Sequence, residues 1–162
     1  MIKGTLNALK TQLLADTALT PYVGTRVTIA RNSDECLKAI KAGETFINIQ
    51  LGPVNREPIP GIGDDDCERV SIDVSLDFAV KASTHDVAVM GLEEEGVLTR
   101  PGIIDIHDLI VSAVTADRTL GNVVSGILRA PNMRSEVYTD REGQMYHGLA
   151  VLSFSFYIDA FK

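Results

Sequence analysis

The sequence contains little cysteine, which limits both its covalent cross-links and its metal chemistry. Its two cysteines are Cys36, in an expected helix, and Cys67, in an acidic segment. Neither has the Cys-x-x-Cys or Cys/His spacing of a zinc or redox site. Structural disulfides are rare in reducing compartments. We therefore expect two free thiols, the alternative being a disulfide in a secreted chain.

Long apolar runs are also missing. No stretch approaches the ~20 apolar residues of a membrane-spanning helix, and residues 1–10 show no charged region followed by an apolar one. Apolar residues make up 45% of the 162-residue chain, which is enough for a core of its own. The sequence predicts one soluble domain over residues 1–162, with no membrane contact, that stays in the cytoplasm where it is made.

An excess of positive charge is absent. The chain has 15 Lys and Arg against 22 Asp and Glu, a formal net charge of −7 at pH 7. Its cations are scattered, and aromatic residues rarely lie among them. Binding to phosphate backbones needs a basic footprint. This balance excludes a generic nucleic-acid binder and favours protein partners.

The motifs of common catalytic centres are missing as well. There is no Gly-x-Ser-x-Gly elbow, Cys67 lies among carboxylates that disfavour its thiolate, and residues 61–63 (Gly-Ile-Gly) precede acids, the wrong sign for an anion-binding loop. His85, His107 and His147 fall in different expected elements. His107 lies on the apolar stripe of its helix, where we expect a partly buried, hydrogen-bonded side chain. We predict no catalytic residue and no cofactor.

An acidic cluster is the best candidate for a metal site. It consists of Asp64, Asp65, Asp66 and Glu68, and carboxylate oxygens suit Mg²⁺ or Ca²⁺. The cluster lacks the alternating ligand spacing of a calcium loop, however, and adjacent side chains rarely converge on one ion. We interpret it as a solvated turn and predict no metal ligand. A small metal-dependent hydrolase that uses Asp64–Asp66 is the enzymatic alternative.

Helical spacing and capping signals predict three helices. Leucines at helical spacing indicate a first helix over about residues 5–15, with Thr5 as its cap and Pro21 preventing continuation. A second helix is expected from about Ser33, ahead of two acids, to Gly43 at the C-cap. The third opens at residues 101–102 (Pro-Gly) and carries a mainly apolar stripe, made up of Ile103, Ile106, His107, Ile110, Ala113, Val114 and Asp117.

Alternating apolar and polar residues predict the strands. They are expected at residues 25–31, at 45–51, over a long run at 70–80, and in a closing hairpin whose arms are 134–139 and 146–158. In the second of these, Phe46, Ile47, Ile49 and Leu51 are expected to face the core. Residues 52–68 contain three prolines and three glycines, so we expect this segment to be irregular. The predicted fold class is α/β (α+β), a mainly antiparallel sheet flanked by two or three helices, with a long C-terminal hairpin.

The order of these elements resembles the bacteriophage tail-terminator family, which includes tail-completion, head–tail joining and neck proteins. The resemblance covers nearly the whole chain. It is carried by the opening segment LKTQLLADTALTPYVGTRV, the strand INIQLGP, the helix IIDIHDLIVSAVTADRTL and the closing hairpin EVYTDREGQMYHGLAVLSFSFYI. Asp117 and Leu120 lie between the helix and the hairpin, as an Asp-x-x-Leu element does in that family. Residues 82–102, with a triple glutamate, depart from the simplest pattern of the family and leave the subfamily open.

The resemblance implies a structural role and no enzyme. Family members form rings, commonly hexameric, at the head-proximal end of the tail tube, where they stop tube polymerisation and join the tail to the neck. The implied partners are further copies of the chain, the tail tube protein and a neck or connector protein, within a virion assembled in the host cytoplasm. DNA would pass through the ring without specific binding. Another tail or neck component, such as a tube or connector protein, is the structural alternative.

Three features of the sequence fit a ring and have plainer explanations too. The strand at 70–80 is expected to contribute to an inner barrel across subunits, although long strands also occur in monomers. The segment 52–68 is expected to order against a neighbour or the tube end, although long loops often have no such role. An acidic channel surface would weaken adhesion to DNA, because like charges repel, although a net charge of −7 is unremarkable for a cytoplasmic protein.

Overall fold

The computed structural model describes residues 1–59, 67–140 and 143–161, without the side chains of Ala130 and Phe161. Its helices are α1 (Ile2–Ala15), α2 (Thr20–Val23), α3 (Ser33–Ala42), α4 (His85–Met90) and α5 (Ile103–Ala116). Its strands are β1 (Val27–Ile29), β2 (Ile47–Pro58), β3 (Cys67–Ala82), β4 (Leu92–Glu94), β5 (Val97–Arg100), β6 (Gly126–Thr139) and β7 (Tyr146–Phe161).

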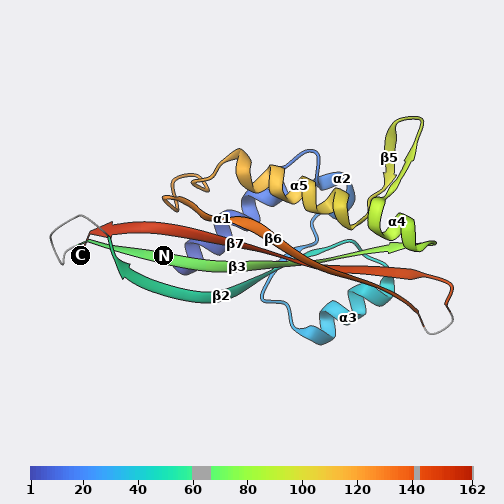
Figure 1. The fold of residues 1–162 in the computed structure, drawn as a ribbon, viewed down its shortest axis with the longest axis horizontal. Coiled ribbons are helices and arrows are strands. Elements are labelled where there is room, and N and C mark those ends of the chain that lie inside the picture. Colours follow the sequence, from blue (N-terminus) through green and yellow to red (C-terminus); the bar gives the residue numbers. More distant parts are fainter. Residues whose placement is uncertain (60–66, 141–142, 162) are drawn as a thin grey trace.

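One five-stranded sheet organises the molecule. Its strand order is β1-β2-β3-β7-β6, in which only the β1–β2 pair is parallel. Helices α1 and α5 lie across one face of the sheet, with α2 and α4 beside them, and α3 lies on the opposite face (Figure 1). The predicted fold class is confirmed: the sheet is mainly antiparallel, helices flank it, and β6 and β7 form a long C-terminal hairpin.

The centre of the sheet is the pairing of β3 with β7. All sixteen residues of β3 have a partner in β7, from Cys67 opposite Phe161 to Ala82 opposite Tyr146. The alternation predicted for residues 70–80 is present, because every second side chain is buried under α1 and α5. These side chains are Val70, Ile72, Val74, Leu76, Phe78 and Val80. Burying each large one contributes about 1.5–3 kcal/mol.

The first helix starts earlier than predicted, at Ile2, and ends at Ala15 as predicted. Thr5 is not its cap: the side chain is buried inside α1, and its hydroxyl donates to the carbonyl oxygen of Met1 at 3.3 Å. The helix ends ahead of Asp16, whose carboxylate accepts a hydrogen bond from the backbone N–H of Leu19 at 2.8 Å. Pro21 therefore does not stop α1. It lies in the first turn of α2, where its missing N–H has no helical partner to lose.

The second predicted helix is α3, which begins at Ser33 as expected. Asn32, rather than Ser33, is the N-cap, and its side-chain oxygen accepts a hydrogen bond from the N–H of Glu35 at 2.9 Å. Gly43 ends the helix at φ 73°, the left-handed conformation that glycine adopts without steric cost. The Gly43 prediction is therefore confirmed.

A compact turn joins α5 to β6. The Asp117 carboxylate accepts hydrogen bonds from the Thr119 hydroxyl at 2.6 Å and from the N–H of Gly121 at 2.7 Å. These bonds, the hydroxyl first, lower the pKa of Asp117. Leu120 is buried at φ 49° within the same turn. The Asp-x-x-Leu element thus anchors the end of α5 to the core.

Residues 52–58 are not irregular, contrary to the sequence prediction. They continue β2 as far as Pro58, while residues 60–66 lie outside the described ranges. In the described chain, β1 pairs only with Ile47–Ile49, so the outer edge of β2 has no strand partner beyond that point. Proline is tolerated on such an edge because no ladder bond needs its N–H. The register against β3 shifts between Leu51 and Val54. Leu51 itself is 47% exposed and lies outside the core.

Residues 85–100 form a helix and a separate hairpin. The apolar run after His85 folds as α4, and β4 pairs antiparallel with β5 around a turn at Glu95 and Gly96. Of the three consecutive glutamates, Glu93 and Glu94 belong to β4 and Glu95 lies in the turn. The hairpin projects from the helix-covered side of the sheet (Figure 1). With α2 and α4, the described residues contain five helices rather than two or three.

The burial pattern predicts a sharp contrast between two leucines. Leu76→Ala is expected to lower the free energy of unfolding by about 2–5 kcal/mol, because it leaves a cavity in the core. Leu51→Ala, the matched control, should cost less than about 1 kcal/mol. Ile72→Asp should prevent folding, since it buries an unpaired charge. Urea unfolding followed by circular dichroism measures all three, and equal losses for the two leucines would contradict the assigned core.

Candidate functional site: the open face of the sheet

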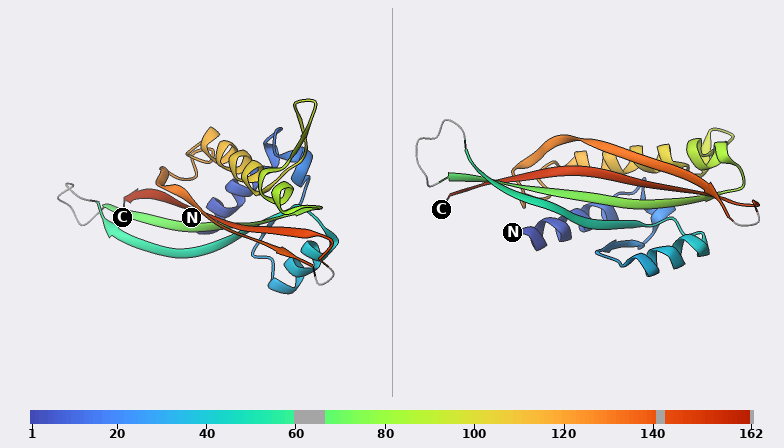
Figure 2. Two further views of the ribbon diagram at one scale, coloured as in Figure 1. Left: turned by 45° about the vertical axis from the view of Figure 1, so that its right-hand side comes forward. Right: turned by 60° about the horizontal axis from the view of Figure 1, so that its bottom comes forward.

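The face of the sheet opposite α1 and α5 is covered only at one end in the described structure, by α3 (Figure 2). We call the remainder of this surface the open face. Register places alternate residues of β2, β3, β7 and β6 on it. They are Asn55, Glu57, Arg69, Ser71, Asp73, Ser75, Arg129, Asn132, Arg134, Glu136, Tyr138, Leu149, Val151, Ser153, Ser155, Tyr157 and Asp159.

The middle of the open face is a shallow polar hollow of about 380 Å³. It is lined by Gly52, Pro53, Asp73, Val74, Ser75, Arg129, Asn132, Ser153, Phe154 and Ser155. The Ser155 hydroxyl donates a hydrogen bond to the Asp73 carboxylate across the β3–β7 pair. A Cβ on Gly52 would lie 3.1 Å from the backbone oxygen of Asp73, so the backbones approach closely here. The lining residues include no histidine, and the hollow suits hydration and polar contact better than nucleophilic chemistry.

Next to this hollow, α3 and β7 form an apolar groove of about 350 Å³, which we call the α3 groove. Its apolar lining includes Leu37, Ile40, Phe46, Leu149 and Val151. Leu37 is 52% and Val151 is 41% exposed, an unusual state for two neighbouring apolar side chains.

Positive charge borders the α3 groove at two places. The Arg31 guanidinium lies 5.9 Å from the centre of the Phe46 ring, and its ion pair with the exposed Glu35 is long, at 3.8 Å. A second hollow shares Leu149 and Val151 with the groove and adds Arg134, which is exposed. The groove therefore combines an apolar floor with arginines on its rim.

Beneath α3 the sheet contains a polar pair, Asn48 and Asp77, of which only Asn48 is fully buried. Asn48 is fully buried; its side-chain oxygen accepts from the Thr28 hydroxyl at 3.1 Å and from the N–H of Arg31 at 2.9 Å. Asp77 lies opposite Asn48 in the β2–β3 register. Burial raises the pKa of Asp77, an effect that hydrogen bonds from Asn48 and Gln50 partly offset. Burial also raises the pKa of the Cys36 thiol in this region.

Ion pairs hold the other end of the sheet. Arg69 forms a bidentate pair with Asp159, at 2.7 and 3.0 Å, and its guanidinium lies 4.5 Å from the centre of the Tyr157 ring. Arg56 contacts Glu68 at 2.6 Å. These pairs tie β2 to β3 and β3 to β7 next to residues 60–66.

The structure disperses the residues singled out in the sequence. Asp64, Asp65 and Asp66 lie outside the described residues, whereas Glu68 is held in β3 by Arg56. Cys67 begins β3 and is buried, and both cysteines are free thiols. Among the described residues, no group of three or more His, Cys, Asp and Glu is arranged to hold a metal ion.

The three histidines lie in three elements. His85 begins α4 and meets the Tyr146 ring edge-on at 6.2 Å, and His147 belongs to β7. His107 Nδ1 lies 2.8 Å from Asp108 Oδ1. Its side chain is 26% exposed, so it is partly buried and hydrogen-bonded as expected.

The α3 groove was not identified from the sequence. The sequence feature that could have indicated the groove lies in β7. There, Leu149 and Val151 alternate with the core residues Ala150 and Leu152. Apolar side chains on the wet side of a half-buried strand indicate a covering element or partner. Which of these covers them depends on where α3 packs, and α3 is distant in sequence.

Within residues 1–59, 67–140 and 143–161, every helix is too short or too polar to cross a membrane. Comparison with known protein families gives no match, and comparison with curated proteins gives none either. Among solved structures, a chain of the "Virion of native gene transfer agent (GTA) particle" aligns with 96% of this chain and 97% of its own length, at 16% identity and a TM-score of 0.40.

The raised pKa of Asp77 predicts a pH-dependent stability. A carboxyl whose pKa is higher in the folded state favours folding while protonated, and that contribution is lost as pH rises through the folded pKa. The melting temperature of the Asp77→Asn variant should therefore rise relative to that of the wild type as pH rises from 4 to 8. Melting temperatures across this range test it. Asp86→Asn is the control, because the Asp86 side chain is fully exposed. A wild-type advantage at pH 8 would contradict the assignment.

Proposed function

We propose that this protein is a structural component of a phage-type particle: a single domain that forms a closed ring at the head-proximal end of a tail tube. The ring ends tube polymerisation and joins the tail to the neck. This proposal takes up the resemblance stated for the sequence. The predicted succession of helix, strand, helix, strand, long strand, helix and hairpin occurs in the structure in that order.

The observation that carries the proposal is the open face. The sheet buries one face under α1 and α5 and leaves most of the other uncovered over strands of up to sixteen residues. The uncovered surface combines a polar hollow with the apolar α3 groove. An exposed apolar groove is typical of a contact with another chain, whereas the polar part of the face can stay hydrated.

The sheet edges favour a finite assembly over an endless ladder. On the β2 side, Pro53 and Pro58 lack the backbone N–H groups that would donate hydrogen bonds to an added strand. On the β6 side, Pro131 lies in the strand, and the register against β7 shifts twice between Ile127 and Asn132. Such edges resist indefinite strand addition. Subunits then meet through side chains, and heterologous contacts of that kind close into a ring when the rotation between copies permits.

The long strand takes a different part in the ring from the one the sequence suggested. β3 has β2 on one edge and β7 on the other, so it cannot pair with a neighbouring copy. In the proposed ring it contributes the side chains of its open face to the channel wall, namely Ser71, Asp73 and Ser75. Arg129 lines the same hollow as Asp73 and Ser75. The net charge of the chain, −7, still disfavours adhesion of DNA to the wall.

Native mass spectrometry over a concentration series, followed by electron microscopy with purified tail tubes, tests the proposal. We expect one discrete closed oligomer and rings at one end of tubes that no longer elongate. The folding-defective Ile72→Asp variant should do neither. Unlimited polymerisation would identify a tube protein instead. Tubes that elongate equally fast with and without the protein would refute the terminator role.

A further inference from the structure

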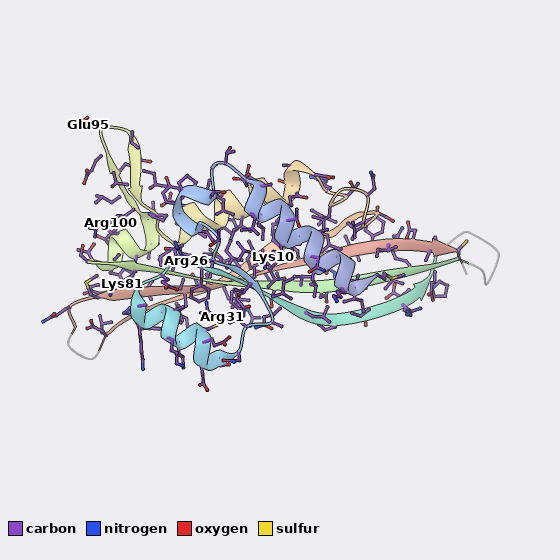
Figure 3. The ribbon with its side chains drawn as sticks, turned by 180° about the vertical axis from the view of Figure 1, so that it is seen from behind. Lys10, Arg26, Arg31, Lys81, Glu95 and Arg100 are labelled. Carbon is purple, nitrogen blue, oxygen red and sulfur yellow. The ribbon has the colours of Figure 1, made fainter. Side chains whose placement is uncertain are left out.

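The β4–β5 hairpin, residues 92–100, is built as a projecting arm. Val97 and the preceding Met90 are each 64% exposed, and Leu92 is exposed as well. Glu95 lies at the far end of the arm, well away from the sheet (Figure 3). Glu93 and Glu94 precede it and are also exposed. A two-stranded hairpin with exposed apolar residues is marginally stable in water, which indicates that a further surface covers it.

The base of the arm is rigid. Gly91, at φ 76°, lies so close to Gly102 that a Cβ on Gly102 would come within 2.3 Å of the Gly91 nitrogen. The Asp105 carboxylate accepts a hydrogen bond from the Gly102 N–H at 2.8 Å, and the Tyr22 hydroxyl donates to the Leu98 carbonyl at 3.1 Å. These contacts restrict the angle at which the arm leaves the sheet. Such preorganisation lowers the entropic cost of association.

The α3 groove has the complementary chemistry. Its residues Leu37 and Val151 are exposed and apolar, as Val97 of the arm is, so contact between them would remove apolar surface from water. Its rim arginines, Arg31 and Arg134, are opposite in charge to the three glutamates of the arm. Acidic groups are also present around the groove, namely Glu35, Asp77 and Glu136. Glu35 only weakly engages Arg31, and Asp77 is half-buried.

The two surfaces lie on opposite sides of the sheet. The arm projects from the side of α4 and α5, whereas α3 lies on the other side (Figures 1 and 3). The α3 groove is formed on that other side, by α3 and β7. One chain therefore cannot place its arm in its own groove, but it can give its arm to one neighbour and receive the arm of another. Resting on the ring proposed above, we propose that the arm of one copy docks in the α3 groove of the next. This head-to-tail contact uses different surfaces on the two partners, as ring closure requires.

Charge reversal tests the electrostatic part of the contact. Glu94→Lys with Glu95→Lys should raise the dissociation constant of the oligomer at least tenfold at low salt, while the circular dichroism spectrum stays unchanged. Adding Arg134→Glu to the same chain should restore part of the affinity, because opposite charges again face each other. Arg118→Glu is the matched control for this restoration, since Arg118 lies in the turn after α5. Unchanged affinity in the arm variant would contradict the charge pairing.

Engineered cross-linking tests the contact itself. Val97→Cys is combined with Leu37→Cys in a Cys36→Ala background, and the protein is oxidised at concentrations that span oligomer formation. We expect disulfide-linked chains up to the full oligomer on a non-reducing gel. Val97→Cys with Val123→Cys, which pairs the arm with an exposed residue outside the groove, should remain uncross-linked.

The outcomes separate the contact from the ring. If the wild-type protein forms closed oligomers but the variant with Val97→Cys and Leu37→Cys forms no cross-link, the arm contact is overturned and the ring stands. Cross-linked products that form open fibres rather than closed rings would support the contact and overturn the ring. A chain that stays monomeric and uncross-linked at every concentration, with or without tubes, would overturn both.

Discussion

The pairing of β3 with β7 is the interaction on which the rest of the structure depends. Sixteen consecutive residue pairs fix which side chains of both strands face α1 and α5 and which face away. A slip of one residue would exchange the two sets completely, because side chains alternate with a period of two. The buried set includes Leu76, Leu152 and Phe156. Their burial makes the observed register far more stable than a register shifted by one residue. The same register that buries these residues leaves Asp73, Ser153 and Ser155 on the open face.

Assembly follows from what this register leaves uncovered. The sheet has no further helix over most of its open face within the described residues, and both of its edges carry proline or register shifts. Growth by strand addition is therefore disfavoured, whereas docking through side chains on the faces is available. The rigid arm on one side and the α3 groove on the other supply two different surfaces of matching chemistry. The proposed ring is thus a consequence of how the sheet is completed, and catalysis is not part of it.

The sequence predicted those elements whose signals are local. The alternation over residues 70–80, the left-handed Gly43, the helix after Gly102 and the closing hairpin were all confirmed, because each depends on periodicity or on a single backbone conformation. Helix ends were less predictable, since Asn32 and Ser33 are neighbours and either side chain is suited to cap α3. The strand character of residues 52–58 depends on which sheet edge is left unpaired, and local composition carries no signal for that.

The candidate site depends on still more distant relations. Leu149 and Val151 become part of a groove only because α3, more than a hundred residues earlier in the chain, packs beside them. The triple glutamate was visible as a departure from the family pattern. That it lies on an arm with a rigid base follows from the contact of Gly91 with Gly102, which no periodicity reveals.

A cryo-electron microscopy reconstruction of the assembled protein would test the central claim most directly, since it shows which way the open face points. We expect a closed ring in which Ser71, Asp73 and Ser153 line the channel and residues 92–100 of each copy lie against α3 of the next. A ring whose channel is lined by α1 and α5, with the open face turned outward and bare, would contradict it.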